Sequence, residues 1–128
     1  MKMENSMKYL ETSKDKFPFT YTLNVMEAIQ EKYGSLQKWS DLIESKTTPE
    51  PDVKALIFFF TEAINEGIEI ENEEKGENRA LVTSKQVGRI ITEIGILDAG
   101  KKLKNAVIDA SKVPDDNNEN DEGQEEKN

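Results

Sequence analysis

The chain contains no cysteine and no histidine among its 128 residues. The lack of cysteine excludes disulfide bridges and thiolate chemistry. The lack of histidine removes the usual general base, the Ser-His and Cys-His arrangements of nucleophilic catalysis, and the commonest zinc ligand. An enzyme built on Asp, Glu, Lys, Tyr or Ser is still conceivable, but the acidic residues are too numerous for any pair to stand out. Glycine loops of the P-loop or dinucleotide type are also missing. We therefore expect a protein that is not an enzyme and uses no metal or cofactor.

Long hydrophobic runs are lacking as well. The longest apolar stretch, residues 55–60, is far too short to cross a membrane. Residues 1–8 are polar and lack the apolar region of a secretory signal. These features predict a cytoplasmic protein with no membrane partner, and the chain length suits one small domain.

Positive charge is scarce relative to negative charge, and the net charge is −9. This balance argues against nonspecific nucleic-acid binding, which needs Lys and Arg against phosphates. Residues 114–128 hold seven acidic residues, one lysine and no apolar residue, which gives a net charge of −6. Such a segment cannot bury enough surface to offset the entropy lost on ordering. We therefore expect one domain over residues 1–113 and a disordered acidic tail, which either solubilises the domain or contacts a partner.

The N-terminal region has the character of a β-hairpin. Aromatic residues alternate from Phe17 to Tyr21, and residues 13–15 favour a turn. This pattern predicts two short strands within about residues 8–22. Pro18 is compatible only with an edge strand or a bulge, because it cannot donate a hydrogen bond to a neighbouring strand.

A compact bundle of about five helices is expected to follow, so the predicted fold is mainly α with a minor β part. Most predicted boundaries coincide with capping or terminating residues. The predicted helix starts are Asn24, Ser35, Pro51, Thr83 and the vicinity of Leu97, and the predicted ends are Gly34, Gly67 and Gly95. Residues 68–71 alternate between Ile and Glu, which suits either a short strand or a frayed helical end. The predicted inward faces include Trp39 and Leu42 of the second helix and Leu103, Val107 and Ala110 of the last.

Residues 51–67 are the one strongly apolar stretch. Its main stripe, at helical spacing, consists of Val53, Leu56, Ile57, Phe60, Ala63 and Ile64. Phe59 flanks this stripe, and Phe58 points nearly opposite to it. A helix that is apolar on more than one side is either central to its fold or covered by a partner. Leu56, Phe58 and Phe59 are therefore candidate partner-binding residues, and Phe58 is expected to contact either the hairpin or a partner chain.

Several segments resemble a known family. Lys8-Tyr9, Phe17-Pro18-Phe19 and Thr22-Leu-Asn-Val-Met-Glu-Ala-Ile-Gln-Glu-Lys-Tyr-Gly-Ser35 resemble the start of small tail assembly chaperones of long-tailed bacteriophages, including siphovirus and prophage members. In that family a short hairpin leads into a helix ending in a (Lys/Arg)-(Phe/Tyr)-Gly element. A helix with tryptophan often follows, and Trp39 occupies that place here. Residues 52–59, 64–67 and 81–87 are also similar, so the likeness covers roughly residues 8–111.

The resemblance implies a non-enzymatic role in tail morphogenesis. Such chaperones hold the tape measure protein, recruit tail tube subunits and leave before the virion is complete. The implied location is the bacterial host cytoplasm, with absence from the mature virion, and self-association is a further interaction to consider. The main alternative is a small acidic adaptor or regulatory protein of phage or prophage origin. A helical nucleic-acid-binding domain and an enzyme are weaker alternatives. The cluster of Lys101, Lys102 and Lys104 is expected to be a solvated face, with phosphate binding as its alternative role.

Overall fold

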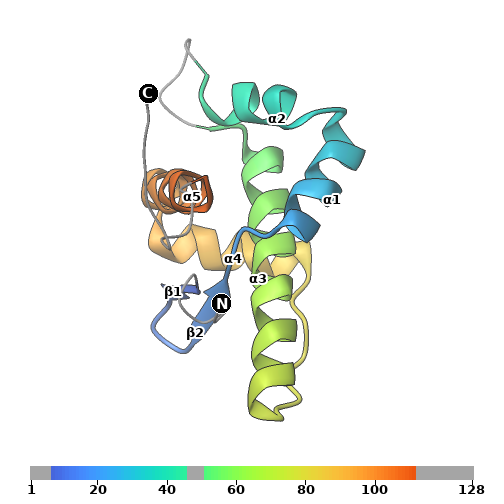
Figure 1. Cartoon of the computed structure of the whole chain (residues 1–128). Helices are drawn as coiled ribbons and strands as arrows, with labels where there is room; N and C mark the ends of the chain where they lie inside the picture. Colours follow the sequence, from blue (N-terminus) through green and yellow to red (C-terminus); the bar gives the residue numbers. More distant parts are fainter. Residues whose placement is uncertain (1–6, 46–50, 112–128) are drawn as a thin grey trace, which may run out of the picture.

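The computed structural model describes residues 7–45 and 51–111, and the predicted acidic tail lies outside these residues. Within the described part, a two-stranded antiparallel hairpin precedes five helices, which confirms the predicted mainly helical class (Figure 1). The elements are β1 (Lys8–Glu11), β2 (Lys16–Phe19), α1 (Leu23–Tyr33), α2 (Leu36–Ile43), α3 (Val53–Lys75), α4 (Ser84–Ile94) and α5 (Ile96–Ala110).

The hairpin is closed by a turn that Thr12 and Asp15 hold together. The Thr12 N–H donates to the Asp15 carbonyl at 2.9 Å, and the Thr12 hydroxyl accepts from the Asp15 N–H at 3.1 Å. Pro18 pairs with Tyr9 in the antiparallel register. Both strands of a two-stranded sheet are edge strands, which is the setting that proline tolerates.

Helix α1 begins earlier than the sequence predicted. Its N-cap is Thr22, whose side chain accepts from the Val25 N–H, so the predicted start at Asn24 is wrong. Thr22 and Asn24 both donate to the Glu66 carboxylate on α3, at 2.8 and 3.1 Å. The side chain of Asn24 is therefore engaged in a contact between helices rather than in capping its own.

Several other helix boundaries that were predicted from capping residues agree with the structure. Ser35 accepts from the Lys38 N–H at 3.0 Å, and Thr83 forms the predicted capping box with Gln86. Gly34 and Gly95 end α1 and α4 at φ angles of 94° and 97°, a region that side chains disfavour.

Helix α3 differs from the prediction at both ends. Asp52 is the N-cap and Pro51 precedes it, so the helix starts slightly later than expected. The predicted end at Gly67 is wrong, because α3 continues to Lys75 and ends at Gly76 with a φ of 65°. Ile68 is a buried residue of this continued helix rather than part of a strand.

Helix α3 is the centre of the fold and contacts β2 and each of the other four helices of the described part. In Figure 1 the hairpin and α5 lie on one side of α3, α1 lies on the other, α2 lies above the start of α3, and α4 passes across it. Trp39 is buried as predicted, whereas Leu42 is 39% exposed. Ala106, and not the predicted Ala110, joins Leu103 in the core, because Ala110 lies a turn beyond the covered part of α5.

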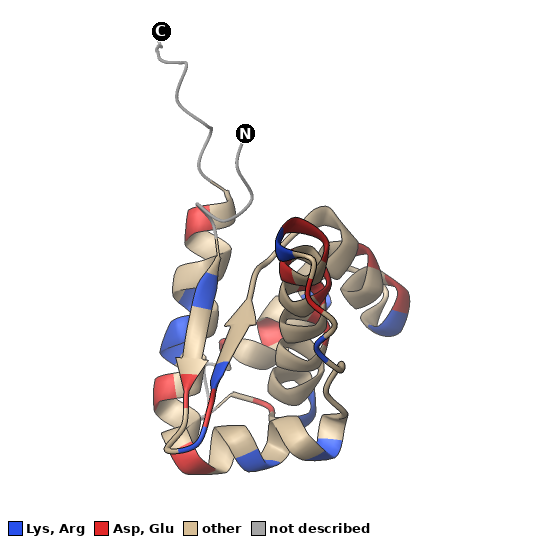
Figure 2. Cartoon of the chain, turned by 90° about the horizontal axis from the view of Figure 1, so that it is seen from below, with Lys and Arg blue, Asp and Glu red and all other residues tan. Residues whose placement is uncertain are grey.

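Charge is distributed unevenly over these elements. Residues 62–77, the second half of α3 and its end, contain seven glutamates and one lysine. Helix α4 has two basic residues, Lys85 and Arg89, against one acidic residue, Glu93. Figure 2 shows the acidic residues gathered along α3 and the basic residues on α4 and α5. The electrostatic potential that a partner meets is therefore negative along the second half of α3 and less negative or positive along α4 and α5.

Candidate functional site

Two of the predicted partner-binding residues lie in the core. Leu56 and Phe59 are fully buried. The Phe59 ring stacks on Trp39 with centroids 5.6 Å apart and meets Phe60 edge-on at 5.0 Å. Neighbouring elements therefore cover both side chains in the folded chain, and a contact of either residue with a partner stays a prediction.

Phe58 is half-buried and packs against the end of α1. Its ring meets Tyr33 edge-on with centroids 5.7 Å apart, and the Lys32 ammonium lies 5.3 Å from its centroid. The aromatic neighbour of Phe58 thus comes from α1, and not from the hairpin, which was one of the two contacts expected from the sequence. A contact between the exposed part of Phe58 and a partner stays a prediction.

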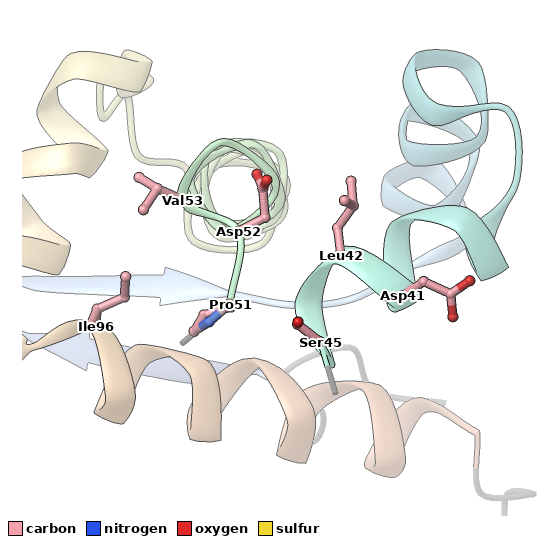
Figure 3. Close-up of a pocket in the computed structure, with 7 residues that line it drawn as sticks. All are labelled: Asp41, Leu42, Ser45, Pro51, Asp52, Val53 and Ile96. Carbon is pink, nitrogen blue, oxygen red and sulfur yellow. The ribbon is translucent and has the colours of Figure 1, made fainter. Parts of the chain in front are cut away.

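One member of the main apolar stripe of α3, Val53, is exposed. Val53, in the first turn, is 55% exposed, whereas Leu56 and Phe60 of the same stripe are fully buried. Val53 lies beside a hollow of about 500 Å³ between the end of α2, the start of α3 and the start of α5 (Figure 3). The hollow is lined by Asp41, Leu42, Ser45, Pro51, Asp52, Val53 and Ile96.

Backbone contacts hold this hollow in shape. The Asp52 N–H donates to the Leu42 carbonyl at 3.0 Å, which ties the start of α3 to the end of α2. The Asp52 carboxylate accepts from the Ala55 N–H at 3.0 Å, and the Trp39 indole donates to the Ala55 carbonyl at 3.3 Å. The first turn of α3 is thus anchored on the side facing α2, while Val53 points toward α4 (Figure 3).

A second hollow, of about 380 Å³, continues from the first between α3 and α4. The two hollows share Val53 and Ile96. The second is lined by Val53, Leu56, Ile57, Lys85, Gly88, Arg89, Ile91, Thr92 and Ile96. Gly88 lines it opposite Ile57, and an added Cβ would lie at an ordinary contact distance of 3.7 Å from Ile57 Cδ1. We call the two hollows together the Val53 groove.

The ends of the Val53 groove carry opposite charges. Lys85 and Arg89 lie on the α4 side, and Asp41 and Asp52 lie on the α2 side; all four are exposed. The salt bridges among the described residues join Lys8 to Asp109, Lys75 to Glu71 and Arg79 to Asp15, so none involves a charge of the groove. The sequence did not single out Lys85 and Arg89, although their spacing of four residues on a predicted helix places them on one face.

A third hollow, of about 350 Å³, lies between α1, α2 and α5. Its lining contains no charged residue and consists of Tyr21, Met26, Leu36, Gln37, Trp39, Ser40, Val107, Ala110 and Ser111. It could accept an apolar group, but it offers no charge that would select or orient a ligand.

The described residues show no arrangement that could bind a metal ion through three or more His, Cys, Asp or Glu side chains. In residues 7–45 and 51–111, no helix combines the length and the apolarity needed to cross a membrane. Comparisons of the chain with protein-family models, with curated proteins and with solved structures find no match. The groove and the sequence resemblance are therefore the two observations from which a function can be argued.

Proposed function

We propose that this protein is a non-enzymatic phage tail assembly chaperone that binds the tape measure protein and recruits tail tube subunits during tail morphogenesis. The observation that carries the proposal is the Val53 groove, an apolar channel on the surface of a small acidic helical protein. Grooves of this kind accept the apolar face of an amphipathic helix. By the resemblance, the tape measure protein is a long helical chain with apolar surface that must be shielded before the tail is built.

The resemblance supports the proposal independently of the groove. It rests on the hairpin, on the Lys32-Tyr33-Gly34 end of α1 and on Trp39 of α2. An adaptor or regulatory protein of phage or prophage origin would also use an exposed apolar groove, and it is the second candidate. The position of the gene separates the two, because a chaperone gene is expected between those for the tail tube and the tape measure.

The direct test is coexpression with the tape measure protein encoded by the same phage or prophage. The soluble fraction of the tape measure protein should rise when this chain is present, and the two should elute together on gel filtration. Val53→Asp should reduce both effects, because it places a charge on the apolar floor of the groove. Leu81→Asp is the matched control, since Leu81 is 49% exposed and does not line the groove. A tape measure protein that stays equally insoluble with and without this chain would overturn the proposal.

A further inference from the structure

We infer that the Val53 groove binds one amphipathic α-helix of a protein partner in a fixed direction. The C-terminal end of that helix lies beside Lys85 and Arg89, and its N-terminal end lies beside Asp41 and Asp52. The inference rests on the proposed function for the existence of a protein partner. It goes further by specifying the binding segment, which has an apolar face, acidic residues near its C-terminal end and basic residues near its N-terminal end.

The form of the groove suits a helix. Two hollows of about 500 and 380 Å³ meet at Val53 and Ile96, so the apolar floor extends from α2 across the start of α3 to α4. Leu42 and Ile57 add apolar surface on either side of this meeting point. Apolar residues at helical spacing project from one face of a partner helix, and successive side chains could enter the two hollows.

The α4 end of the groove selects negative charge. Lys85 and Arg89 lie one helical turn apart, are exposed, and form no salt bridge within the described part of the chain. The C-terminal end of a helix carries a partial negative charge from its unpaired carbonyl groups, and acidic side chains there add to it. The C-terminal end of the bound helix is therefore favoured at α4.

The α2 end selects the opposite charge. Asp41 Oδ1 accepts a hydrogen bond from Gln37 at 2.9 Å, and Asp52 Oδ1 caps its own helix at 3.0 Å from the Ala55 N–H. These bonds use one oxygen of each carboxylate, and Figure 3 shows the Asp41 carboxylate pointing away from the other residues that line the hollow. The positive N-terminal end of a helix, or a lysine near it, is attracted first to Asp52, which directly precedes Val53, and Asp41 adds negative charge further along α2. Nucleic acid is disfavoured as an occupant, because its phosphates would be repelled at this end.

The experiment uses two designed peptides of about 18 residues, roughly 27 Å when helical. Both carry the same apolar face and a hydrocarbon staple on the opposite face that holds them helical. The first has Lys in its N-terminal turns and Glu in its C-terminal turns, and the second has these charges exchanged. Fluorescence anisotropy measures each dissociation constant, and methyl NMR spectra of the protein locate the site through Val53, Ile57 and Ile96.

The first peptide should bind about tenfold more tightly than the second, and the difference should shrink as salt is added. The double variant Lys85→Glu, Arg89→Glu should abolish or invert this preference. Lys101→Glu, Lys104→Glu is the matched control, because it changes the net charge equally at exposed α5 residues outside the groove, and it should leave the preference intact. All four positions are exposed, so both variants should keep the melting temperature of the parent protein.

Equal affinity for the two peptides would overturn the inference, as would an equal effect of the two double variants. Methyl shifts confined to the hollow between α1, α2 and α5 would also overturn it. Shifts of the groove methyls that depend on protein concentration, with no peptide present, would identify a second copy of this chain as the occupant and reject the inferred partner. If the peptides discriminate but the tape measure protein is not solubilised, the proposed function fails and the inference stands. If the tape measure protein is solubilised but the two peptides bind equally well, the proposed function stands and the inference fails.

Discussion

A Cβ atom added to Gly67 of α3 would lie 2.9 Å from both the carbonyl carbon and the carbonyl oxygen of Pro18 in β2. The hairpin therefore rests directly on the backbone of the central helix. Thr20 strengthens this contact, because its N–H donates to the carbonyl of Ala63 at 3.2 Å. Ala63 lies one turn before Gly67 and is fully buried. Small residues on one face of α3 thus set how closely the hairpin approaches.

Gly67→Ala should lower the free energy of unfolding by about 1–3 kcal/mol, because the new methyl group must displace the backbone at Pro18. The matched control is Gly88→Ala, where the added Cβ would lie 3.7 Å from Ile57 Cδ1. That change should be neutral or stabilise by up to about 1 kcal/mol through better helix propensity. Urea unfolding of the two variants measures both effects. Equal effects at the two sites would show that helix propensity, and not the contact with Pro18, governs Gly67.

Trp39→Ala should lower the free energy of unfolding by about 3–5 kcal/mol. Trp39 is 2% exposed, stacks on Phe59 and donates to the Ala55 carbonyl, so its removal leaves a cavity and an unpaired acceptor. Trp39→Phe should cost less, because it keeps a ring against Phe59. Thermal and urea unfolding measure the change. An unchanged melting temperature together with lost partner binding would identify Trp39 as a surface contact.

Phe58→Ser should lower the free energy of unfolding by about 1–3 kcal/mol, since it removes a half-buried ring from Tyr33. A double-mutant cycle with Tyr33→Leu should yield a coupling of about 0.5–1.5 kcal/mol for the edge-on ring pair. If stability is unchanged while association with a tail protein weakens by about 1–2 kcal/mol, Phe58 acts as a partner contact instead.

Tyr33→Phe should raise the free energy of unfolding by up to about 1 kcal/mol. The Tyr33 hydroxyl is buried and has no hydrogen-bond partner among the described residues, so its loss removes a desolvated polar group while the ring stays against Phe58. Tyr9→Phe is the matched control. It removes an exposed hydrogen bond of 2.6 Å to Glu71 and should be neutral or slightly destabilising. The urea unfolding midpoints of both variants are measured in parallel and compared with that of the parent protein. A lower midpoint for Tyr33→Phe than for the parent would contradict the prediction.

The stability of the protein should also fall at alkaline pH. Burial raises the pKa of Tyr33 above its ordinary value of 10.0, and the nearby Asp52 carboxylate raises it further. The folded state then holds its phenol proton more tightly than the unfolded state. The stabilisation is complete below pH 10.0 and is lost as the pH rises through the higher folded pKa. Between about pH 8 and pH 11, Tyr33→Phe should therefore lose less stability than the parent chain. If the parent chain and Tyr33→Phe lose equal stability over this pH range, ionisation of Tyr33 is not the cause of the alkaline loss.

The helix boundaries show which features local sequence can predict. Ser35 and Thr83 cap their helices through bonds to residues three positions away, so the few residues around each cap contain the whole signal. Gly34 and Gly95 end helices through their own backbone angles. Gly67 is also a glycine, but it does not end a helix. A side chain is excluded there because the backbone of Pro18, 49 positions earlier in the chain, lies too close.

By itself, the sequence determined the absence of cysteine and histidine chemistry, the hairpin, the number of helices, and which face of α3 is apolar. Only the tertiary structure decided how far other elements cover that face. Leu56 and Val53 belong to one stripe, yet Leu56 is fully buried and Val53 is 55% exposed. Likewise, the pairing of a basic and an acidic end across the groove depends on α4 and α2 lying on opposite sides of the start of α3. Hydrophobic periodicity records the direction of a side chain along one helix, whereas burial depends on segments distant in sequence.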